Sequence, residues 1–243
     1  MDGSESLYSY LFVKLELGKL LWAARIPLLL TAAAMPLAIV LGLFLALMRT
    51  SRHGWLSWPA AGYIEVMRGT PLFVQLFLVY YSLPRIGYAI FGNDMLTLEP
   101  FTAAVICLGA NYAAYEAEIH RAGLQAIDKG QREAALSIGM SEQQSFRIVV
   151  LPQAFRIVLP PVINDAIAML KDSCLASAIG VQELLRTAEG IGRAKFISEP
   201  MYIADAVLYM ILSLGFYALG KWVESKLKAQ GRAELKVEQM HGH

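Results

Sequence analysis

Charge is scarce in this sequence: only 17% of its 243 residues are Asp, Glu, Lys or Arg, and the net charge is +1. Soluble globular domains usually have about one charged residue in four, so the composition argues against that class. A nearly neutral chain also offers no electrostatic reason to bind nucleic acid.

The two cysteines, Cys107 and Cys174, lie in apolar segments, which favours small buried side chains over a disulfide. His53 and His120 have no partners at ligand spacing, so no metal site is expected.

The sequence also lacks the pattern GxxxxGK[ST] of a phosphate-binding loop, so we expect this chain itself to bind no nucleotide cofactor. An intramembrane aspartyl enzyme would need two carboxylates close enough to share a proton. Asp165 and Asp172 are seven residues apart, which on one helix places them about 10 Å apart along the axis. No catalytic residue is therefore predicted, although an intramembrane enzyme remains an alternative.

Apolar residues, in contrast, are abundant, at 56% of the chain, and the mean hydropathy is +0.47. Because about 20 apolar residues cross the hydrocarbon core of a bilayer, we predict an all-α polytopic membrane protein with about five transmembrane helices. The predicted spans are 26–48, 61–83, 101–120, 157–180 and 201–220. The predicted organisation is an uncleaved interfacial segment at 1–25, a transmembrane domain at 26–224 and a charged tail at 225–243.

Lysine and arginine predict the orientation of the chain, because cytoplasmic loops carry an excess of both. Most of the 21 Lys and Arg residues fall in 49–68, in 121–156 and in the segment that follows the last span. With five spans, this distribution predicts an N-terminus outside the cell and a cytoplasmic C-terminus.

One charged block, EAALSIGMSEQQSFRIVVLP, runs from Glu133 to Pro152 between two apolar stretches. Its first part favours a short helix that ends at Gly139. Ser141 and Gln144 have the spacing of a capping box and predict the start of a second helix, which Pro152 should interrupt or kink. The residues alone favour a helix–Gly–helix unit as much as an ordinary amphipathic loop on the lipid headgroups.

The same block resembles the EAA loop of ABC-importer permeases. In that loop E-A-A is followed after three residues by G and, nine residues later, by a β-branched residue, one residue and L-P. The matching positions are Glu133, Ala134, Ala135, Gly139, Leu151 and Pro152, with Val149 where isoleucine is more usual. The stretches RGTPLFVQL (68–76), YEAEIHRAGLQAIDKGQREAA (115–135) and LKDSCLASAIGVQELL (170–185) resemble the polar amino-acid branch of that family, of the histidine, glutamine and arginine type.

The resemblance implies half of the pore of a type I ABC importer in the bacterial inner membrane, with a cytoplasmic coupling loop at about 125–156. The implied partners are a dimer of ATPase subunits that binds ATP and magnesium, a second permease (identical or related), an extracytoplasmic solute-binding protein, a polar amino acid and membrane lipid. The residues implied in coupling to the ATPase are Glu133, Ala134, Ala135, Gly139, Ser141, Leu151 and Pro152. An ATP-independent channel or scaffold is the alternative, but it would have no use for such a docking block.

Polar residues inside spans usually face the interior of a helix bundle. Helical spacing gathers them into stripes that we predict to line the solute pathway. The predicted pathway residues are Arg68, Gln75, Asn111, Tyr115, Glu118, Asn164, Asp165, Lys171 and Asp172. The alternatives to a role in the solute pathway are structural ion pairs. These are an intrahelical Glu65–Arg68 pair, an interfacial Glu118–Arg121 pair and a buried Lys171–Asp172 pair. Because the stripes contain both signs of charge, they leave open whether the amino acid is basic, acidic or neutral.

Overall fold

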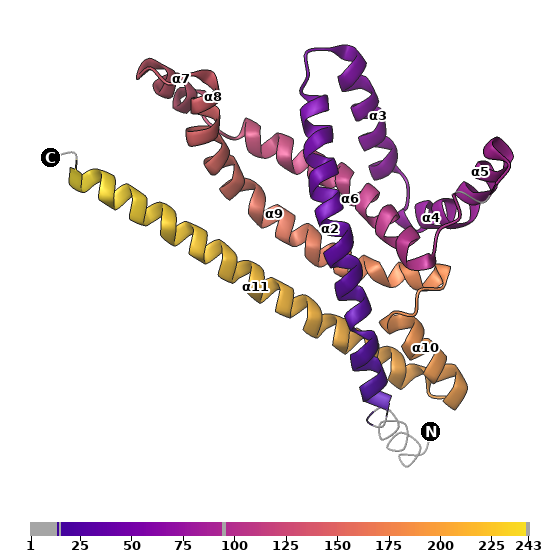
Figure 1. The fold of residues 1–243 in the computed structure, drawn as a ribbon. Coiled ribbons are helices and arrows are strands. Elements are labelled where there is room, and N and C mark those ends of the chain that lie inside the picture. Colours follow the sequence, from indigo (N-terminus) through magenta and orange to yellow (C-terminus); the bar gives the residue numbers. More distant parts are fainter. Residues whose placement is uncertain (1–13, 15, 94–95, 242–243) are drawn as a thin grey trace.

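The computed structural model describes residues 14, 16–93 and 96–241, and within these ranges every regular element is a helix (Figure 1). The α-helices are α2 (Arg25–Arg49), α3 (Gly54–Gly69), α4 (Leu72–Phe77), α5 (Leu83–Phe91), α6 (Pro100–Gln125), α7 (Lys129–Ser137), α8 (Glu142–Gln144), α9 (Leu151–Asp172), α10 (Leu184–Lys195) and α11 (Ser198–His241). Two π-helical segments (Leu78–Ser82 and Ser145–Val150) and one 3-10 segment (Ser173–Ile179) join some of them without a break. The all-α prediction is confirmed.

Three continuous helical stretches of the described chain are long and apolar enough to cross a membrane: Glu16–Arg49, Glu142–Ile179 and Ser198–Lys226. They contain, to within one residue, the predicted spans 26–48, 157–180 and 201–220. The span predicted at 101–120 lies within α6, whose 26 residues reach about 39 Å, although α6 is not among those three. The count of five spans is therefore not confirmed.

The prediction of one continuous span at 61–83 is wrong. The helix α3 ends at Gly69, Thr70 has an extended backbone (φ −118°, ψ 144°), and α4 begins only after Pro71. The cause is local, because the ring of a proline disfavours helical geometry at the residue before it. Apolar composition alone does not reveal this break, which shapes the candidate site described below.

Close packing of α2 against α6 forms the centre of the molecule, and small residues permit it. A Cβ atom added to Gly42 would lie 2.5 Å from the Cβ of Glu116, and one added to Gly109 would lie 2.6 Å from the Cδ2 of Leu37. Both distances are too short for real atoms. The two backbones therefore approach as closely as they do only because these positions are glycines.

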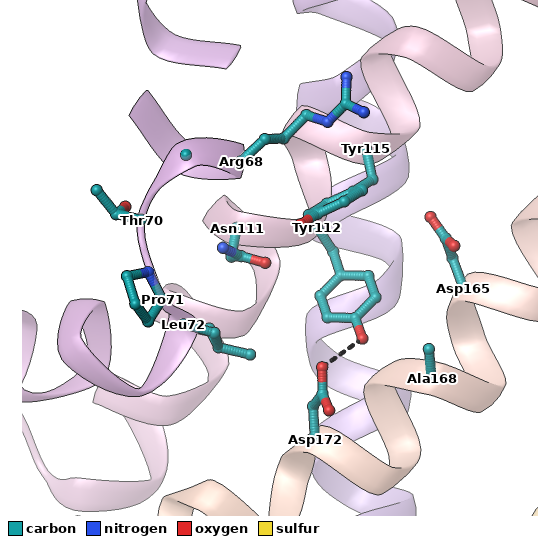
Figure 2. Close-up of a pocket in the computed structure, with 11 residues that line it drawn as sticks. Arg68, Thr70, Pro71, Leu72, Asn111, Tyr112, Tyr115, Asp165, Ala168 and Asp172 are labelled. Atoms are coloured by element: carbon teal, nitrogen blue, oxygen red, sulfur yellow. Dashed lines mark hydrogen bonds between the residues drawn. The ribbon is translucent and has the colours of Figure 1, made fainter. Parts of the chain in front are cut away.

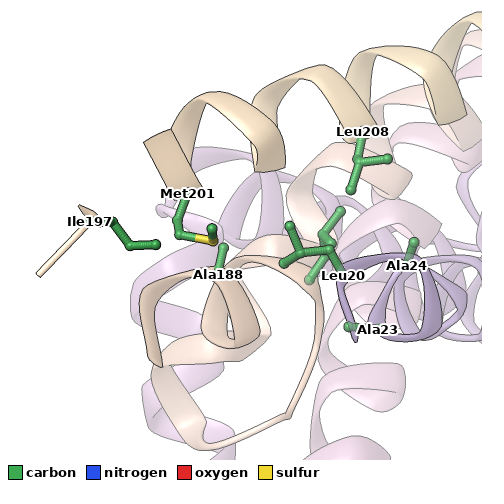
Figure 3. Close-up of a cluster of buried hydrophobic side chains, with 8 residues drawn as sticks. Leu20, Ala23, Ala24, Ala188, Ile197, Met201 and Leu208 are labelled. Carbon is green, nitrogen blue, oxygen red and sulfur yellow. The ribbon is translucent and has the colours of Figure 1, made fainter. Parts of the chain in front are cut away.

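The helix that leads into α2 packs against α10 and α11 (Figure 3). Leu20 and Ala23 are fully or almost fully buried there, together with Ala188 and Met201. Glu16 forms an ion pair with Lys195 at the end of α10. The described part of the predicted segment 1–25 is thus held against the C-terminal helices, while residues 1–13 and 15 lie outside the described residues.

Glu183 organises the turn into α10. Its carboxylate accepts hydrogen bonds from the backbone N–H of Leu185 (2.8 Å) and of Arg186 (2.7 Å), as an N-cap does, and from the hydroxyl of Tyr209 (2.8 Å). Burial raises the pKa of this carboxyl group, and the hydrogen bonds to its charged form oppose that effect.

Different helices lie at the two ends of the molecule. The start of α2 and α10 lie at one end, and α7 and α8 lie at the opposite end (Figure 1). From α10, α11 runs toward the end where α7 and α8 are found, and its helix includes the predicted tail as far as His241.

Candidate solute cavity and coupling loop

The break between α3 and α4 forms one wall of a polar cavity of about 490 Å³ (Figure 2). The other walls come from α6 and α9. The residues that line it are Arg68, Gly69, Thr70, Pro71, Leu72, Asn111, Tyr112, Tyr115, Asp165, Ala168 and Asp172. The volume lies in the range of small-molecule sites in proteins. Five predicted pathway residues therefore meet in one place: Arg68, Asn111, Tyr115, Asp165 and Asp172.

Gln75 and Asn111 hold the break in shape. The side-chain Nε2 of Gln75 donates to the carbonyl oxygens of Met67 (2.9 Å) and Thr70 (3.2 Å). The Nδ2 of Asn111 donates to the Met67 carbonyl (3.1 Å) and to the Oε1 of Gln75 (2.9 Å). An interrupted helix in a membrane leaves carbonyl groups that need such partners. Gln75 is thus a brace behind the cavity and does not line it.

The α9 side of the cavity carries two carboxylates that differ in their hydrogen bonding. Asp172 Oδ2 accepts a hydrogen bond of 2.8 Å from the hydroxyl of Tyr112. Asp165 Oδ2 is buried and finds no hydrogen-bond partner among the described residues. The sequence did not predict Tyr112, because the polar stripe on α6 was taken through Asn111 and Tyr115. Its spacing of three residues from Tyr115 was the available signal.

Arg68 enters the cavity from the end of α3, whereas these carboxylates come from α9 (Figure 2). Its Cζ lies 5.3 Å from the centroid of the Tyr115 ring, a cation–π distance. Among the described residues it forms no ion pair with Glu65, so the intrahelical Glu65–Arg68 pair considered above is absent.

The remaining predicted pathway residues lie elsewhere. Glu118 pairs with Arg121, with 2.5 Å between Oε2 and Nη2, and does not line the cavity. Asn164 and Lys171 are exposed on α9 and do not line the cavity either. Among the described residues Lys171 forms no ion pair with Asp172. Of the polar residues predicted on α9, Asp165 and Asp172 therefore line the cavity, whereas Asn164 and Lys171 do not.

The loop at the opposite end of the molecule forms the predicted helix–Gly–helix unit. Asp128 caps α7 by accepting from the backbone N–H of Gly130 (2.6 Å). Gly139 follows the helix with φ +89°, a backbone conformation that favours glycine. Ser141 and Gln144 form the predicted capping box, with hydrogen bonds of 3.3 Å and 2.8 Å. The glycine stop and the capping box are confirmed.

The prediction that Pro152 interrupts or kinks the second helix is wrong as to interruption. The helix runs without a break from Glu142 to Ile179. The π-helical segment Ser145–Val150 precedes Pro152, which lies in the first turn of α9. A π-helical turn is wider and shifts the hydrogen bonds by one residue, so a ring without an N–H is accommodated there.

The residues implied in coupling are mostly accessible on this loop. Glu133, Ala134, Gly139, Ser141, Leu151 and Pro152 are exposed, whereas Ala135 is buried. Apolar side chains between them are exposed as well, including Ile138 (76%) and Ile148 (61%). Exposed apolar groups amid polar ones are typical of a surface that another protein covers.

Within the described ranges, no group of three or more His, Cys, Asp and Glu side chains is placed to hold a metal ion. The molecule combines membrane-spanning helices, a polar cavity at a broken helix and a structured loop at one end. These features define a transport permease.

The chain belongs to the family of binding-protein-dependent transport system inner membrane components, whose pattern matches residues 38–229. It is 39% identical over 217 residues to the arginine transport system permease protein ArtQ of Bacillus subtilis (strain 168), covering 84% of this chain and 94% of that protein. It is 38% identical over 218 residues to the glutamine transport system permease protein GlnP of Escherichia coli (strain K12), covering 86% and 96%.

A solved structure supports the same family. The crystal structure of an amino acid ABC transporter with histidines includes a chain that is 37% identical, with a TM-score of 0.75 over 93% of this chain and 99% of that one. The resemblance to amino-acid ABC-importer permeases is thus confirmed, and the chain is an inner membrane component of a transport system.

Proposed function

We propose that this chain forms half of the translocation pore of an ATP-driven importer for polar amino acids. The observation that carries the proposal is the polar cavity, in which a cation and two carboxylates face one another between α3, α6 and α9. A zwitterionic solute needs groups of both signs, and the cavity has them. The transport of amino acids by the relatives named above supports the same solute class.

The loop that includes α7 and α8 receives the energy for transport. It docks on a separate ATPase subunit through the exposed Glu133, Ala134 and Gly139. The buried Ala135 supports the first helix, and Ser141, Leu151 and Pro152 support the second. The exposed Ile138 and Ile148 supply apolar contact area for the docking. ATP and magnesium bind to that partner, and this chain holds no cofactor and catalyses no reaction of its own.

The orientation follows from this assignment. The docking loop lies in the cytoplasm, and α10 and the start of α2 lie on the outer side, where the solute-binding protein delivers its cargo. The C-terminus is cytoplasmic and the N-terminus is outside. A second permease, identical or related, completes the pore, and lipid surrounds the outer faces of the helices.

Reconstitution tests the proposal. The chain is co-purified with its ATPase and second permease, placed in proteoliposomes with ATP at the ATPase side, and supplied with the solute-binding protein and labelled amino acids. We expect uptake of a polar amino acid that requires ATP hydrolysis. Uptake at the same rate without ATP would show a passive channel, and the absence of uptake of every amino acid would overturn the proposal.

A further inference from the structure

The charges that line the polar cavity do not balance. Its lining holds one cationic side chain, Arg68, and two carboxylates, Asp165 and Asp172. We propose that the transported solute is a basic amino acid, with its α-carboxylate toward Arg68 and its two cationic groups toward Asp165 and Asp172. This inference rests on the proposed function and narrows it to one substrate class.

The placement of the three groups matches such a solute. Arg68 enters the cavity from α3, and both aspartates enter it from α9 (Figure 2). The aspartates are two helical turns apart, about 10 Å along α9, and Ala168 between them is small enough to leave room. A basic amino acid carries an ammonium group at its α-carbon and a second cation at the end of a long side chain. It therefore presents two separated cations to two separated carboxylates.

Neutral and acidic amino acids fit the charges less well. A neutral solute brings one cation and leaves one carboxylate unmatched in a partly desolvated site, which is costly. An acidic solute brings a second carboxylate close to the two already there. Asp165 has the greater need of a cation, because its Oδ2 has no hydrogen-bond partner among the described residues, whereas Asp172 accepts from Tyr112.

Among the described residues, the charged groups next to the lining add no cation to it. Glu116 on α6 is fully buried and does not line the cavity. Its Oε2 lies 3.7 Å from the Nε2 of His120. Glu118 is neutralised by Arg121, and Lys171 is exposed and outside the lining. Among the described lining residues, Arg68 is thus the one cation that offsets the acidic groups.

Binding to the permease itself tests the inference, because a solute-binding protein would impose its own selectivity. The permease–ATPase complex is placed in lipid nanodiscs without the solute-binding protein. Labelled arginine is bound at equilibrium and displaced by unlabelled lysine, glutamine or glutamate. We expect arginine and lysine to bind about 10- to 100-fold more tightly than glutamine, since hydrogen bonds between charged groups are worth that factor, and glutamate to bind most weakly.

Charge-neutralising variants identify the groups responsible. Asp165→Asn and Asp172→Asn should each lower the affinity for arginine about tenfold or more, and Asp172→Glu should restore arginine binding. The one of the two variants that removes the partner of the side-chain cation should leave the affinity for glutamine similar. A variant that fails to fold would lose both ligands together, so the ratio of the two affinities is the deciding quantity. Glu65→Gln, on the exposed side of α3 outside the lining, is the matched control and should leave the ratio unchanged.

The outcomes separate this inference from the proposed function. Equal or tighter binding of glutamine or glutamate, or an unchanged ratio in both aspartate variants, would overturn the basic class. If ATP-driven uptake of a neutral or acidic amino acid were then found in proteoliposomes, the proposed function would stand without it. If no amino acid were taken up, both would fail.

Discussion

Gly42 of α2 lies against Glu116 of α6 so closely that a Cβ atom on the glycine would come 2.5 Å from the Cβ of the glutamate and 3.0 Å from the carbonyl oxygen of Ala113. Neither of these two neighbouring atoms can rotate away, because one is a first side-chain carbon and the other is backbone. The two helices must therefore separate if any side chain is added. This contact fixes α6, and with it the α6 wall of the polar cavity.

We predict that Gly42→Ala destabilises the protein, because even one methyl group overpacks this contact, at a cost of about 1–3 kcal/mol. The measurement is the temperature at which the purified protein loses its monodisperse peak in size-exclusion chromatography. Gly215→Ala on α11 is the control, since a Cβ there meets nothing within 4 Å. Equal melting of the two variants would mean that α2 and α6 are not packed as described.

A second prediction concerns the brace behind the break at Thr70. Gln75→Leu removes the donor to the carbonyl oxygens of Met67 and Thr70 and the acceptor for Asn111. Buried polar groups that lose their partners cost about 1–3 kcal/mol, so stability should fall and solute uptake should fall with it.

The double variant is the sharper measurement. Asn111→Leu alone should also destabilise, but Gln75→Leu combined with Asn111→Leu should cost less than the sum of the two single changes, because both residues belong to one hydrogen-bond network. Additive losses of stability would show that the two side chains act independently and would refute the brace.

The sequence predicted the helical class and the local geometry of the helix–Gly–helix unit well, because both depend on local signals. Gly139 and the Ser141–Gln144 capping box act within a few residues of their own position, and the structure has both. The break at Pro71 is also local, but a run of apolar residues on either side of it concealed its effect. The continuity through Pro152 could not be foreseen, since it depends on a π-helical segment that composition does not mark.

The cavity was predictable only in part. Helical spacing found Asp165 and Asp172, yet it grouped them with Lys171, which does not line the cavity. Spacing alone does not show which face of a helix turns inward. On a helix, consecutive side chains point about 100° apart, and only the packing of other helices decides which face turns inward. Gln75 was found as a polar residue in a span, but its role as a brace depends on the broken backbone beside it.

The last prediction tests the coupling loop at Gly139. Its φ of +89° strains any side chain that carries a Cβ, at a cost of about 1–2 kcal/mol, and β-branched residues suffer most. We predict that Gly139→Val changes the angle between α7 and the helix that follows. The protein should still insert in the membrane, and ATP should still be hydrolysed by the partner, but uptake per ATP should fall about tenfold or more, the loss expected if about 1.4 kcal/mol of coupling is removed.

Two further variants separate backbone strain from added bulk. Gly139→Asn should keep most of the uptake, because asparagine tolerates a positive φ better than valine does. Ser137→Ala, on the exposed face of α7, is the control and should transport as the wild type does.

The ratio of solute taken up to phosphate released in proteoliposomes is the quantity to measure. An unaltered ratio in Gly139→Val would mean that α7 and α8 do not transmit the work of the ATPase. A loss of ratio in Gly139→Asn as large as in Gly139→Val would assign the effect to the side chain itself and not to the geometry of the turn.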